Sequence, residues 1–391
     1  MGNYKLVIKA GKVITPFHVY HDYVVAVDNE GKIGFIGPKS EFTGSGDLFI
    51  DASDKILAPG FIDIHIHGAN GADVIEGKIE SVERVASFIV KHGVTGFYPT
   101  TVTSPLEMIK RSIKSLVEAI RRGVRGARIL GIHTEGPFFS LEKAGAQDRR
   151  YLLKPSIDLI NELLELGEGY IKRVTLAPEI DGALDAIRFL KNEGIVVAMG
   201  HTNATYDEAI RAIEAGATVA NHIYNQMRNF HHRDPGILGA VLTRDDVYAE
   251  IIIDEVHHHY AAREIVIRCK GTDKVALITD SIMATGLPDG EYMLGAQKII
   301  IKNGVSRLPD GTLAGSTLTM DRAIRNTVRH LNVSLQDAIK MATYVPAKIM
   351  GIDSRYGSIK IGKQGDLVIL DNDMNVLKTI INGEVIYSHN K

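Results

Sequence analysis

Residues 59–68 read Pro-Gly-Phe-Ile-Asp-Ile-His-Ile-His-Gly, and this stretch decides the fold of the chain. Its apolar run predicts a strand that is buried on both faces. Side chains two residues apart point to the same face of a strand, so His65 and His67 are expected to converge. Gly68 ends the strand and places the pair at its carboxyl end, where parallel barrels carry their active sites. The pair is therefore a candidate metal site, with two buried, hydrogen-bonded histidines as the structural alternative.

The composition favours a globular protein that acts on small molecules. Of the 391 residues, 45% are hydrophobic and 24% are charged, and the formal net charge is -2. That charge gives no electrostatic basis for binding nucleic acid or an anionic membrane. The single cysteine, Cys269, cannot form an internal disulfide, which suits a reducing cytoplasm. No uncharged run approaches the roughly 18–20 residues of a spanning helix, and the amino terminus lacks the apolar core of a signal peptide. We therefore expect a cytoplasmic protein without a membrane segment.

The two ends of the chain share a pattern of short strands broken by turns. Asn29-Glu30-Gly31 near one end and Asn382-Gly383 near the other are typical of hairpin turns. We expect residues 1–53 and 346–391 to form one small β-sandwich domain built from both termini. Residues 54–345 then form a larger domain inserted between its halves.

Within the inserted domain, strand-like runs alternate with helix-like runs. This alternation predicts parallel pairing with right-handed crossovers, and eight such units favour a (β/α)8 barrel of the TIM type. An open doubly wound sheet is the alternative, but no Gly-X-Gly-X-X-Gly or phosphate-loop motif supports a nucleotide-binding version of it. After the strand that carries His65, the expected strands cover residues 93–100, 127–134, 173–179, 195–201, 217–222, 248–254 and 274–280.

Two of the expected helices carry start signals. Ser104-Pro105-Leu106-Glu107 has the pattern of a capping box with proline at the first helical position, and apolar residues at helical spacing follow it. Thr205-Tyr206-Asp207-Glu208 predicts a second capping box.

Six expected strands end in histidine, glutamate or aspartate, which would gather these side chains at one mouth of the barrel. A single such residue is readily explained as a satisfied core group or a helix cap, whereas recurrence at equivalent positions indicates a shared site. Imidazole nitrogens and carboxylate oxygens bind zinc and similar divalent metals, and a catalytic site leaves one position open for water. Beyond the first strand, these ends are at Glu135, Glu179, His201, His222 and Asp280.

Asp280 is the candidate general base. Beside a metal-activated water, its carboxylate could take a proton as the oxygen attacks a carbonyl, and then pass the proton to a leaving nitrogen. This predicts hydrolysis. Nucleophilic catalysis has little support, because no Gly-X-Ser-X-Gly motif is present and Cys269 falls inside an expected helix.

With these residues in hand, the chain resembles the amidohydrolase superfamily over nearly its whole length, and within it the N-acetylglucosamine-6-phosphate deacetylase family. The stretch at 59–68 matches the superfamily alone. The narrower resemblance rests on five further motifs: His-Thr-Glu-Gly-Pro-Phe-Phe at 133–139, Gly-His-Thr-Asn-Ala at 200–204, His-Ile-Tyr-Asn-Gln-Met at 222–227, Thr-Asp-Ser-Ile-Met-Ala-Thr-Gly at 279–286 and Leu-Ala-Gly-Ser-Thr-Leu-Thr-Met at 313–320.

The resemblance implies a barrel with a primary metal held by Glu135, His201 and His222, and with Asp280 as general base and then general acid. His65 and His67 match a pair that holds a second metal in some members. One or two divalent ions per subunit are therefore expected, with zinc favoured and iron, cobalt or manganese as alternatives.

The same matching implies the substrate contacts. Asn225 and the backbone at Gln226 should contact the sugar phosphate, Arg233 should bind the phosphate, and His257 should bind the substrate. Gln147 stands where many members have a substrate-contacting histidine. Members commonly form homodimers in which such groups reach across the interface.

Three features depart from the family pattern. Gln147 can donate a hydrogen bond but cannot become positively charged. Gln226 replaces a usual small residue and could tighten the pocket, and His231 and His232 beside Arg233 could alter the phosphate site. His258 and His259 are expected at the surface.

The resemblance thus implies hydrolysis of the acetamide of N-acetylglucosamine 6-phosphate, giving glucosamine 6-phosphate and acetate in amino sugar catabolism. A second hypothesis keeps the site and changes the substrate to an unphosphorylated N-acetyl amino sugar, another N-acyl compound or a cyclic amide. A third is a non-catalytic barrel that acts as a binding or scaffold protein, which loss of Asp280 or of a metal ligand would have favoured.

Overall fold

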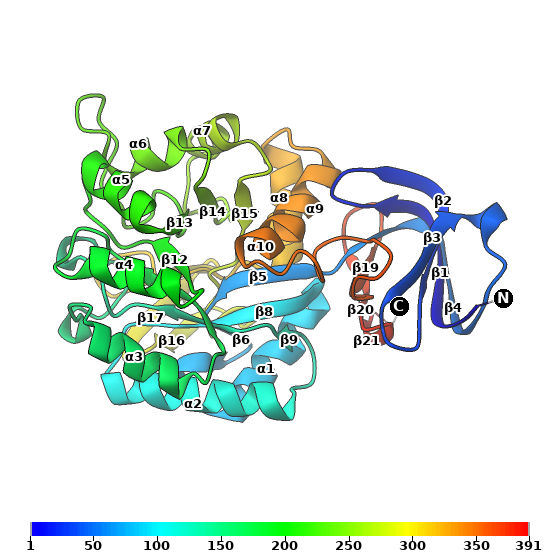
Figure 1. The fold of residues 1–391 in the computed structure, drawn as a ribbon, viewed down its shortest axis with the longest axis horizontal. Coiled ribbons are helices and arrows are strands. Elements are labelled where there is room, and N and C mark those ends of the chain that lie inside the picture. The colour runs from blue at the N-terminus through cyan, green and yellow to red at the C-terminus, as the bar shows by residue number, and fades with distance from the viewer. Residues whose placement is uncertain (1, 390–391) are drawn as a thin grey trace.

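A computed structural model describes residues 2–389, and its larger part is the expected (β/α)8 barrel (Figure 1). Neighbouring strands pair in parallel in the order in which they occur along the chain. All residues of the first strand are buried, as its apolar run predicted. The barrel strands are β5 (Phe61–Ile66), β8 (Val94–Thr101), β10 (Ile132–Glu135), β11 (Ile171–Leu176), β12 (Val196–Met199), β13 (Ala217–Ala220), β14 (Tyr248–Ile251) and β15 (Val275–Leu277), and the short β9 (Arg128–Ile129) pairs with β8.

The seam between the first and last barrel strands is closed just beyond β15. The backbone N–H of Asp280 donates to the carbonyl oxygen of His65 at 2.9 Å, and the N–H of His67 donates to the carbonyl oxygen of Ser281 at 2.9 Å. The hydrogen bonds that close the barrel therefore join three of the predicted site residues through their backbones.

Helices surround the barrel, and the two capping predictions have different outcomes. Thr205 and Glu208 form the predicted capping box at the start of α5 (Tyr206–Ala215). The prediction for Ser104 is wrong: α2 (Leu106–Arg122) begins directly after Pro105, which holds the capping position and has no side-chain acceptor. The Ser104 hydroxyl lies one residue too far back and is buried without a partner. The remaining helices are α1 (Ile79–Ile89), α3 (Ile157–Leu166), α4 (Ala183–Asn192), α6 (Gly236–Thr243), α7 (Tyr260–Lys270), α8 (Met320–His330), α9 (Leu335–Ala342) and α10 (Tyr344–Ile349).

Strands from both termini form one seven-stranded sheet beside the barrel, on the right in Figure 1. Both predicted hairpins are present, between β2 and β3 and between β20 and β21. The long strand β4 ends at Pro59, and β5 begins at Phe61, so the sheet leads directly into the strand that carries His65. The domain boundaries at residues 53 and 346 stay a prediction. In spatial order the strands are β21 (Glu384–Ser388), β20 (Val376–Ile381), β19 (Leu367–Leu370), β4 (Ser45–Pro59), β1 (Asn3–Ile14), β2 (Val19–Val27) and β3 (Ile33–Pro38).

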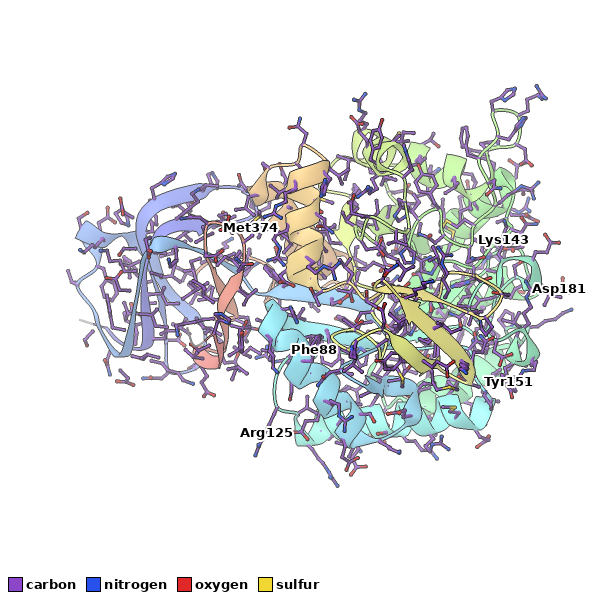
Figure 2. All side chains as sticks on the ribbon, turned by 180° about the vertical axis from the view of Figure 1, so that it is seen from behind. Phe88, Arg125, Lys143, Tyr151, Asp181 and Met374 are labelled. Atoms are coloured by element: carbon purple, nitrogen blue, oxygen red, sulfur yellow. The ribbon has the colours of Figure 1, made fainter. Side chains whose placement is uncertain are left out.

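A small antiparallel sheet follows the last barrel strand, and the sequence analysis did not anticipate it. It consists of β16 (Gly290–Leu294), β17 (Gln297–Lys302) and β18 (Val305–Arg307). Figure 2 shows this yellow sheet in front of the barrel when the molecule is seen from behind. The sheet and the segment after it contribute Leu294, Thr312, Leu313 and Gly315 to the central pocket. A two-stranded ribbon, β6 (Gly68–Ala69) with β7 (Ala72–Asp73), follows β5.

No helix within residues 2–389 has the length and apolar character needed to cross a membrane.

Candidate active site

The predicted site residues gather at the carboxyl ends of the barrel strands. His65 lies in β5, His67 follows it, and Glu135 is the last residue of β10. His201, His222 and Asp280 come just after β12, β13 and β15, and each has a positive φ, at 47°, 22° and 47°. Left-handed backbone is uncommon for residues other than glycine, although histidine and aspartate adopt it more readily than most, and such conformations are concentrated at functional sites.

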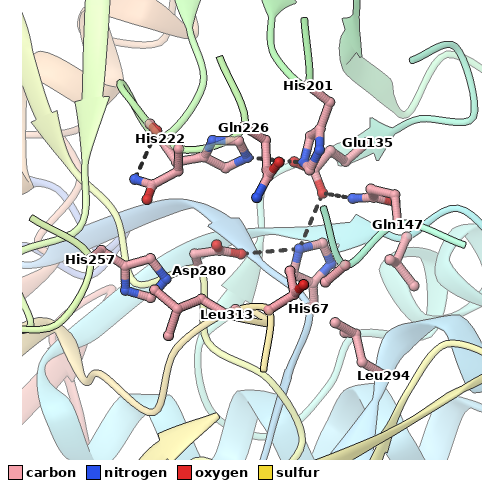
Figure 3. A pocket seen from close by; sticks show the side chains of 15 residues that line it. His67, Glu135, Gln147, His201, His222, Gln226, His257, Asp280, Leu294 and Leu313 are labelled. Carbon is pink, nitrogen blue, oxygen red and sulfur yellow. Dashed lines mark hydrogen bonds and ion pairs between the residues drawn. The ribbon is translucent and has the colours of Figure 1, made fainter. Parts of the chain in front are cut away.

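Six of these side chains come close enough to share one or two ions. Figure 3 shows His67, Glu135, His201, His222 and Asp280 among them. Candidate ligand atoms fall into two groups, within each of which all atoms lie within 4.8 Å of one another: Glu135 with His201 and His222, and Asp280 with His65 and His67.

Glu135 stands between the two groups. Its Oε1 lies 3.2 Å from His222 Nε2 and 3.6 Å from His201 Nε2. Its Oε2 lies 3.3 Å from His67 Nε2. One carboxylate thus faces both groups, which is the arrangement of a ligand that could bridge two ions.

In three histidines the ring nitrogen that faces away from Glu135 and Asp280, Nδ1, lies beside an oxygen acceptor. This far nitrogen therefore determines the protonation of Nε2, the nitrogen that faces the carboxylates. Nδ1 of His67 donates to the carbonyl of Thr100 at 3.0 Å, and Nδ1 of His201 donates to the carbonyl of Lys143 at 3.0 Å. Nδ1 of His65 lies 3.2 Å from Glu250 Oε2. A neutral imidazole that carries its proton on Nδ1 presents a bare lone pair at Nε2. Three such lone pairs directed at carboxylates need a proton or a cation between them.

A divalent cation fits this requirement. Nε2 of His65 is buried and has no hydrogen-bond partner, although Glu135 and Asp280 lie 3.3 and 3.6 Å away. Burial alone would lower the pKa of His65, but the two carboxylates outweigh it and raise the pKa to about 9. The site therefore draws positive charge to these nitrogens, and imidazole with carboxylate suits zinc and its neighbours.

A buried polar network supports His65 from behind. Arg173 is fully buried, pairs with Glu250 and donates to Asn221. Glu250 accepts from His65 in turn, as carboxylates commonly do behind metal-binding histidines. The sequence analysis missed these residues, although a charged residue inside an apolar strand, such as Glu250 in Tyr248–Ile251, was a usable signal.

Asp280 points into the same space. Its Oδ1 lies 3.2 Å from His67 Nε2 and its side chain is 11% exposed, so it borders the cavity. Burial opposes its ionisation, but the nearby His65 and His67 more than compensate and lower the pKa of Asp280. It is thus a carboxylate able to accept a proton at the cavity wall.

The cavity above these groups has a volume of about 330 Å³ and opens at the barrel mouth. Predicted substrate residues Gln147, Asn225, Gln226 and His257 all line it (Figure 3). Nδ1 of His257 lies 2.7 Å from Asp254 Oδ2, which leaves Nε2 as its remaining polar atom. Asp254 is a further residue that sequence analysis missed.

His258 is not the surface residue that the sequence analysis expected. It is 5% exposed, and its Nδ1 and Nε2 lie 3.0 Å from the Ile252 carbonyl oxygen and from Asn225 Nδ2. Burial lowers the pKa of His258 to about 4, so the ring is neutral near pH 7. It holds the Asn225 amide nitrogen, which also donates to the His222 carbonyl, and leaves the Asn225 oxygen for the cavity. His259 is exposed at the start of α7, as expected.

Arg233 lies apart from the other predicted residues. It is exposed in the segment between β13 and α6, contacts His232 at 2.9 Å, and does not line the cavity. None of the fifteen described residues that line the cavity is a lysine or arginine. One chain therefore brings together residues of the types that bind metals, but no lysine or arginine lines the described cavity to bind a phosphate.

Comparisons with known proteins find relatives over nearly the whole chain. The family model described as "Amidohydrolase family" matches residues 56–386. N-acetylglucosamine-6-phosphate deacetylase from Vibrio furnissii is 37% identical over 97% of this chain and 94% of its own length. N-acetylgalactosamine-6-phosphate deacetylase from Escherichia coli O157:H7 is 38% identical over 85% of this chain and 88% of its own length. A mutant of N-acetyl-D-glucosamine-6-phosphate deacetylase from Mycobacterium smegmatis, solved with N-acetyl-D-glucosamine-6-phosphate, superposes with a TM-score of 0.92 at 33% identity, over 98% of this chain and all of the other.

Proposed function

Because this chain belongs to the amidohydrolase family, we propose that it removes the acetyl group from N-acetylglucosamine 6-phosphate, giving glucosamine 6-phosphate and acetate. The observation that carries the proposal is the meeting of Glu135, His201, His222 and Asp280 in one cavity. The relatives that match nearly the whole chain support the choice of substrate.

Glu135, His201 and His222 would hold the primary divalent cation, and His65 and His67 would hold a second. A cation bound there lowers the pKa of water towards about 7 and polarises the substrate carbonyl. Zinc is the favoured ion, with iron, cobalt and manganese as alternatives, since the donor set suits all four.

Asp280 moves the proton. Its carboxylate accepts a proton from water as the oxygen attacks the acetyl carbon, and it returns that proton to the sugar nitrogen as the C–N bond breaks. The products at this point are acetic acid and a free amine, and the acid then passes its proton to the amine to give acetate and an ammonium group, so atoms and protons balance. Its position 3.2 Å from His67 Nε2 and at the cavity wall suits this role.

The opposite wall would bind the sugar. His257 donates from Nδ1 to Asp254, so its Nε2 can donate to a substrate oxygen when the ring is protonated, and Asn225 can accept from a sugar hydroxyl. Neither group is a cation-forming lysine or arginine, so neither balances a dianionic phosphate by itself.

The test of the proposal is an assay of the Asp280→Asn variant together with its metal content. Loss of the proton shuttle should lower kcat by about 10²–10⁴-fold, the usual contribution of general acid–base catalysis. Metal content should stay at the wild-type value. Asp181→Asn, which alters a surface aspartate paired with Lys154, is the matched control and should leave turnover unchanged. A fully active Asp280→Asn variant would contradict the proposed mechanism.

We further propose that the protein works as a homodimer in which Arg233 enters the cavity of the partner copy. Arg233 is exposed and away from its own cavity, and the described lining of that cavity has no lysine or arginine for the phosphate. In a two-fold symmetric dimer, Arg233 of each copy would complete the cavity of the other copy.

Mixing two defective variants tests this arrangement, with activity assayed at a substrate concentration well below the KM of the Arg233→Ala protein. Arg233→Ala and Asp280→Asn chains, unfolded and refolded together at equal amounts, should regain activity. In random pairing about a quarter of the sites combine an intact Asp280 with a partner arginine. If the mixture has no more activity than the two variants measured apart, Arg233 does not act across an interface.

A second candidate substrate is N-acetylgalactosamine 6-phosphate, because the relative from Escherichia coli O157:H7 that carries this name is 38% identical. Measuring kcat/KM for both sugar phosphates and for unphosphorylated N-acetylglucosamine separates the candidates. A preference for the unphosphorylated sugar would overturn the assignment of a phosphorylated substrate.

A further inference from the structure

Gln147 makes two side-chain hydrogen bonds at the edge of the proposed metal site. It is 5% exposed and lies between Thr103 and Glu135. The backbone N–H of Thr103 donates to its Oε1 at 2.7 Å, and its Nε2 donates to Glu135 Oε2 at 2.8 Å. Figure 3 shows the amide reaching Glu135 from the side of the cavity opposite His257.

The direction of this amide is fixed by chemistry. A backbone N–H can only donate, so the atom facing Thr103 must be the oxygen. The amide nitrogen then necessarily faces Glu135, whose ionised carboxylate can only accept. Both contacts fail if the amide is turned over, so the two bonds hold one orientation.

The backbone around Gln147 is also held in place by hydrogen bonds. Its N–H donates to the carbonyl of Ala144 at 2.9 Å, and Gln297 at the start of β17 donates to the carbonyl of Ala146 at 2.6 Å. The small sheet after the barrel thus fixes the backbone that presents this side chain.

On the other side of the carboxylate, Asn221 Nδ2 donates to Glu135 Oε1 at 3.0 Å. Two neutral amides therefore hold the two oxygens of Glu135 from opposite sides. This holds Oε1 towards His201 and His222 and Oε2 towards His67.

We propose that Gln147 is a positioning residue that orients Glu135 for metal binding, and that this is its main role in place of substrate recognition. A neutral amide fixes the carboxylate by hydrogen bonding and leaves its negative charge for the cation. An imidazolium at the same place would form an ion pair with Glu135 and compete with the metal. Hydrogen bonds to metal-binding carboxylates typically change metal affinity by about 10–100-fold when removed.

The inference rests on the metal site of the proposed function, so its test measures metal binding directly. The variant is Gln147→Leu, which is similar in size and cannot donate. The dissociation constant for Zn²⁺ is measured on metal-free protein by competition with a chromophoric chelator, and KM and kcat are measured at saturating Zn²⁺. Zn²⁺ binding should weaken by about 10–100-fold, while KM at saturating metal changes by less than about threefold.

Two further variants keep the result decisive. Gln147→Asn retains a polar amide but is one methylene too short to reach both Thr103 and Glu135, so it should also weaken Zn²⁺ binding, even if the leucine variant folds poorly. Gln226→Ala removes the other glutamine that lines the cavity and is the matched control, with Zn²⁺ binding unchanged.

Unchanged Zn²⁺ binding in both Gln147 variants, with KM raised, would overturn the inference and make Gln147 a substrate-binding group. That outcome would leave the proposed function standing. A wild-type protein that binds no divalent cation would overturn both, so the two failures are distinguishable.

Discussion

The proposed metal ligands form the metal side of the site, and the residues proposed to bind the substrate form its recognition side. The two sides are held in different ways. On the metal side, the far nitrogens of His65, His67 and His201 are held by a carboxylate or a backbone carbonyl. On the recognition side, Arg233 is exposed and makes its hydrogen bonds with the neighbouring His231 and His232. The difference teaches that one chain brings the candidate metal ligands and Asp280 together in one cavity, whereas Arg233 of the same chain stays outside that cavity.

Removing Glu250 should break the metal side most severely. In Glu250→Gln, the fully buried Arg173 loses its charged partner, and breaking a buried pair in this way costs about 3–5 kcal/mol. Urea unfolding of the metal-free protein measures the loss in the free energy of unfolding. Glu264→Gln, which removes the exposed partner of Arg268, should unfold as the wild type does. Equal free energies of unfolding for the two variants would show that the buried Arg173–Glu250 pair does not contribute to stability by this amount.

Removing the arginine should affect recognition alone. In Arg233→Ala, loss of a charge-assisted bond to phosphate should raise KM for the phosphorylated sugar by roughly 10–100-fold, with kcat and Zn²⁺ content nearly unchanged. KM for the unphosphorylated sugar is the internal reference and should not move. A fall in Zn²⁺ content would mean that the two sides are coupled.

His257 lies on the boundary between the two sides, and its titration sharpens the comparison. Burial lowers the pKa of His257, but the Asp254 carboxylate outweighs burial and raises it, with Asp280 adding to the rise and Arg307 opposing it. The adjacent His258 is neutral near pH 7. A raised pKa keeps the imidazolium populated to higher pH, so KM for the anionic substrate should increase as pH rises through that pKa.

Asp254→Asn should remove the upward shift in the pKa of His257. The rise in KM should then begin at lower pH, and KM at neutral pH should be about 10-fold higher than in the wild type, if one charged hydrogen bond is lost. Profiles of KM and kcat against pH for both proteins provide the measurement. Superimposable KM profiles would exclude Asp254 as a positioning residue for His257.

The smallest effect is expected at the helix start that follows His201. Thr205→Ala removes the cap of α5 and should lower the free energy of unfolding by about 1 kcal/mol. Ser104→Ala is the contrast: its hydroxyl is buried without a partner, so its removal should leave stability unchanged or slightly higher. Thermal unfolding of the two variants compares them. A larger loss for Ser104→Ala would mean that its hydroxyl has a partner that the structure lacks.

Local sequence rules predicted much of the fold and less of the site. The spacing of His65 and His67 was enough to place both side chains on one face, because a strand has a period of two. The Thr205 capping box depends on four consecutive residues and was predicted correctly. Residues 104–107 have the same Ser/Thr-X-X-Glu pattern, but the prediction of a capping box there was wrong. The helix begins one residue later than expected, with Pro105 in the capping position.

The groups that support the site could not be read from neighbouring residues. Arg173, Glu250 and His65 are far apart in sequence and meet only inside the closed barrel. The same holds for Gln147, whose two partners are 44 and 12 residues away. His258 was expected at the surface together with His259, yet the loop turns it into the protein.

The sequence by itself determined the barrel and the strand ends that carry the candidate ligands, because periodicity and strand order act over short stretches of chain. Only the tertiary structure decided which oxygen of Glu135 faces which histidine, which way the Gln147 amide points, and that Arg233 stays outside its own cavity. Those features depend on distances between residues remote in sequence, and such distances exist only once the barrel has closed.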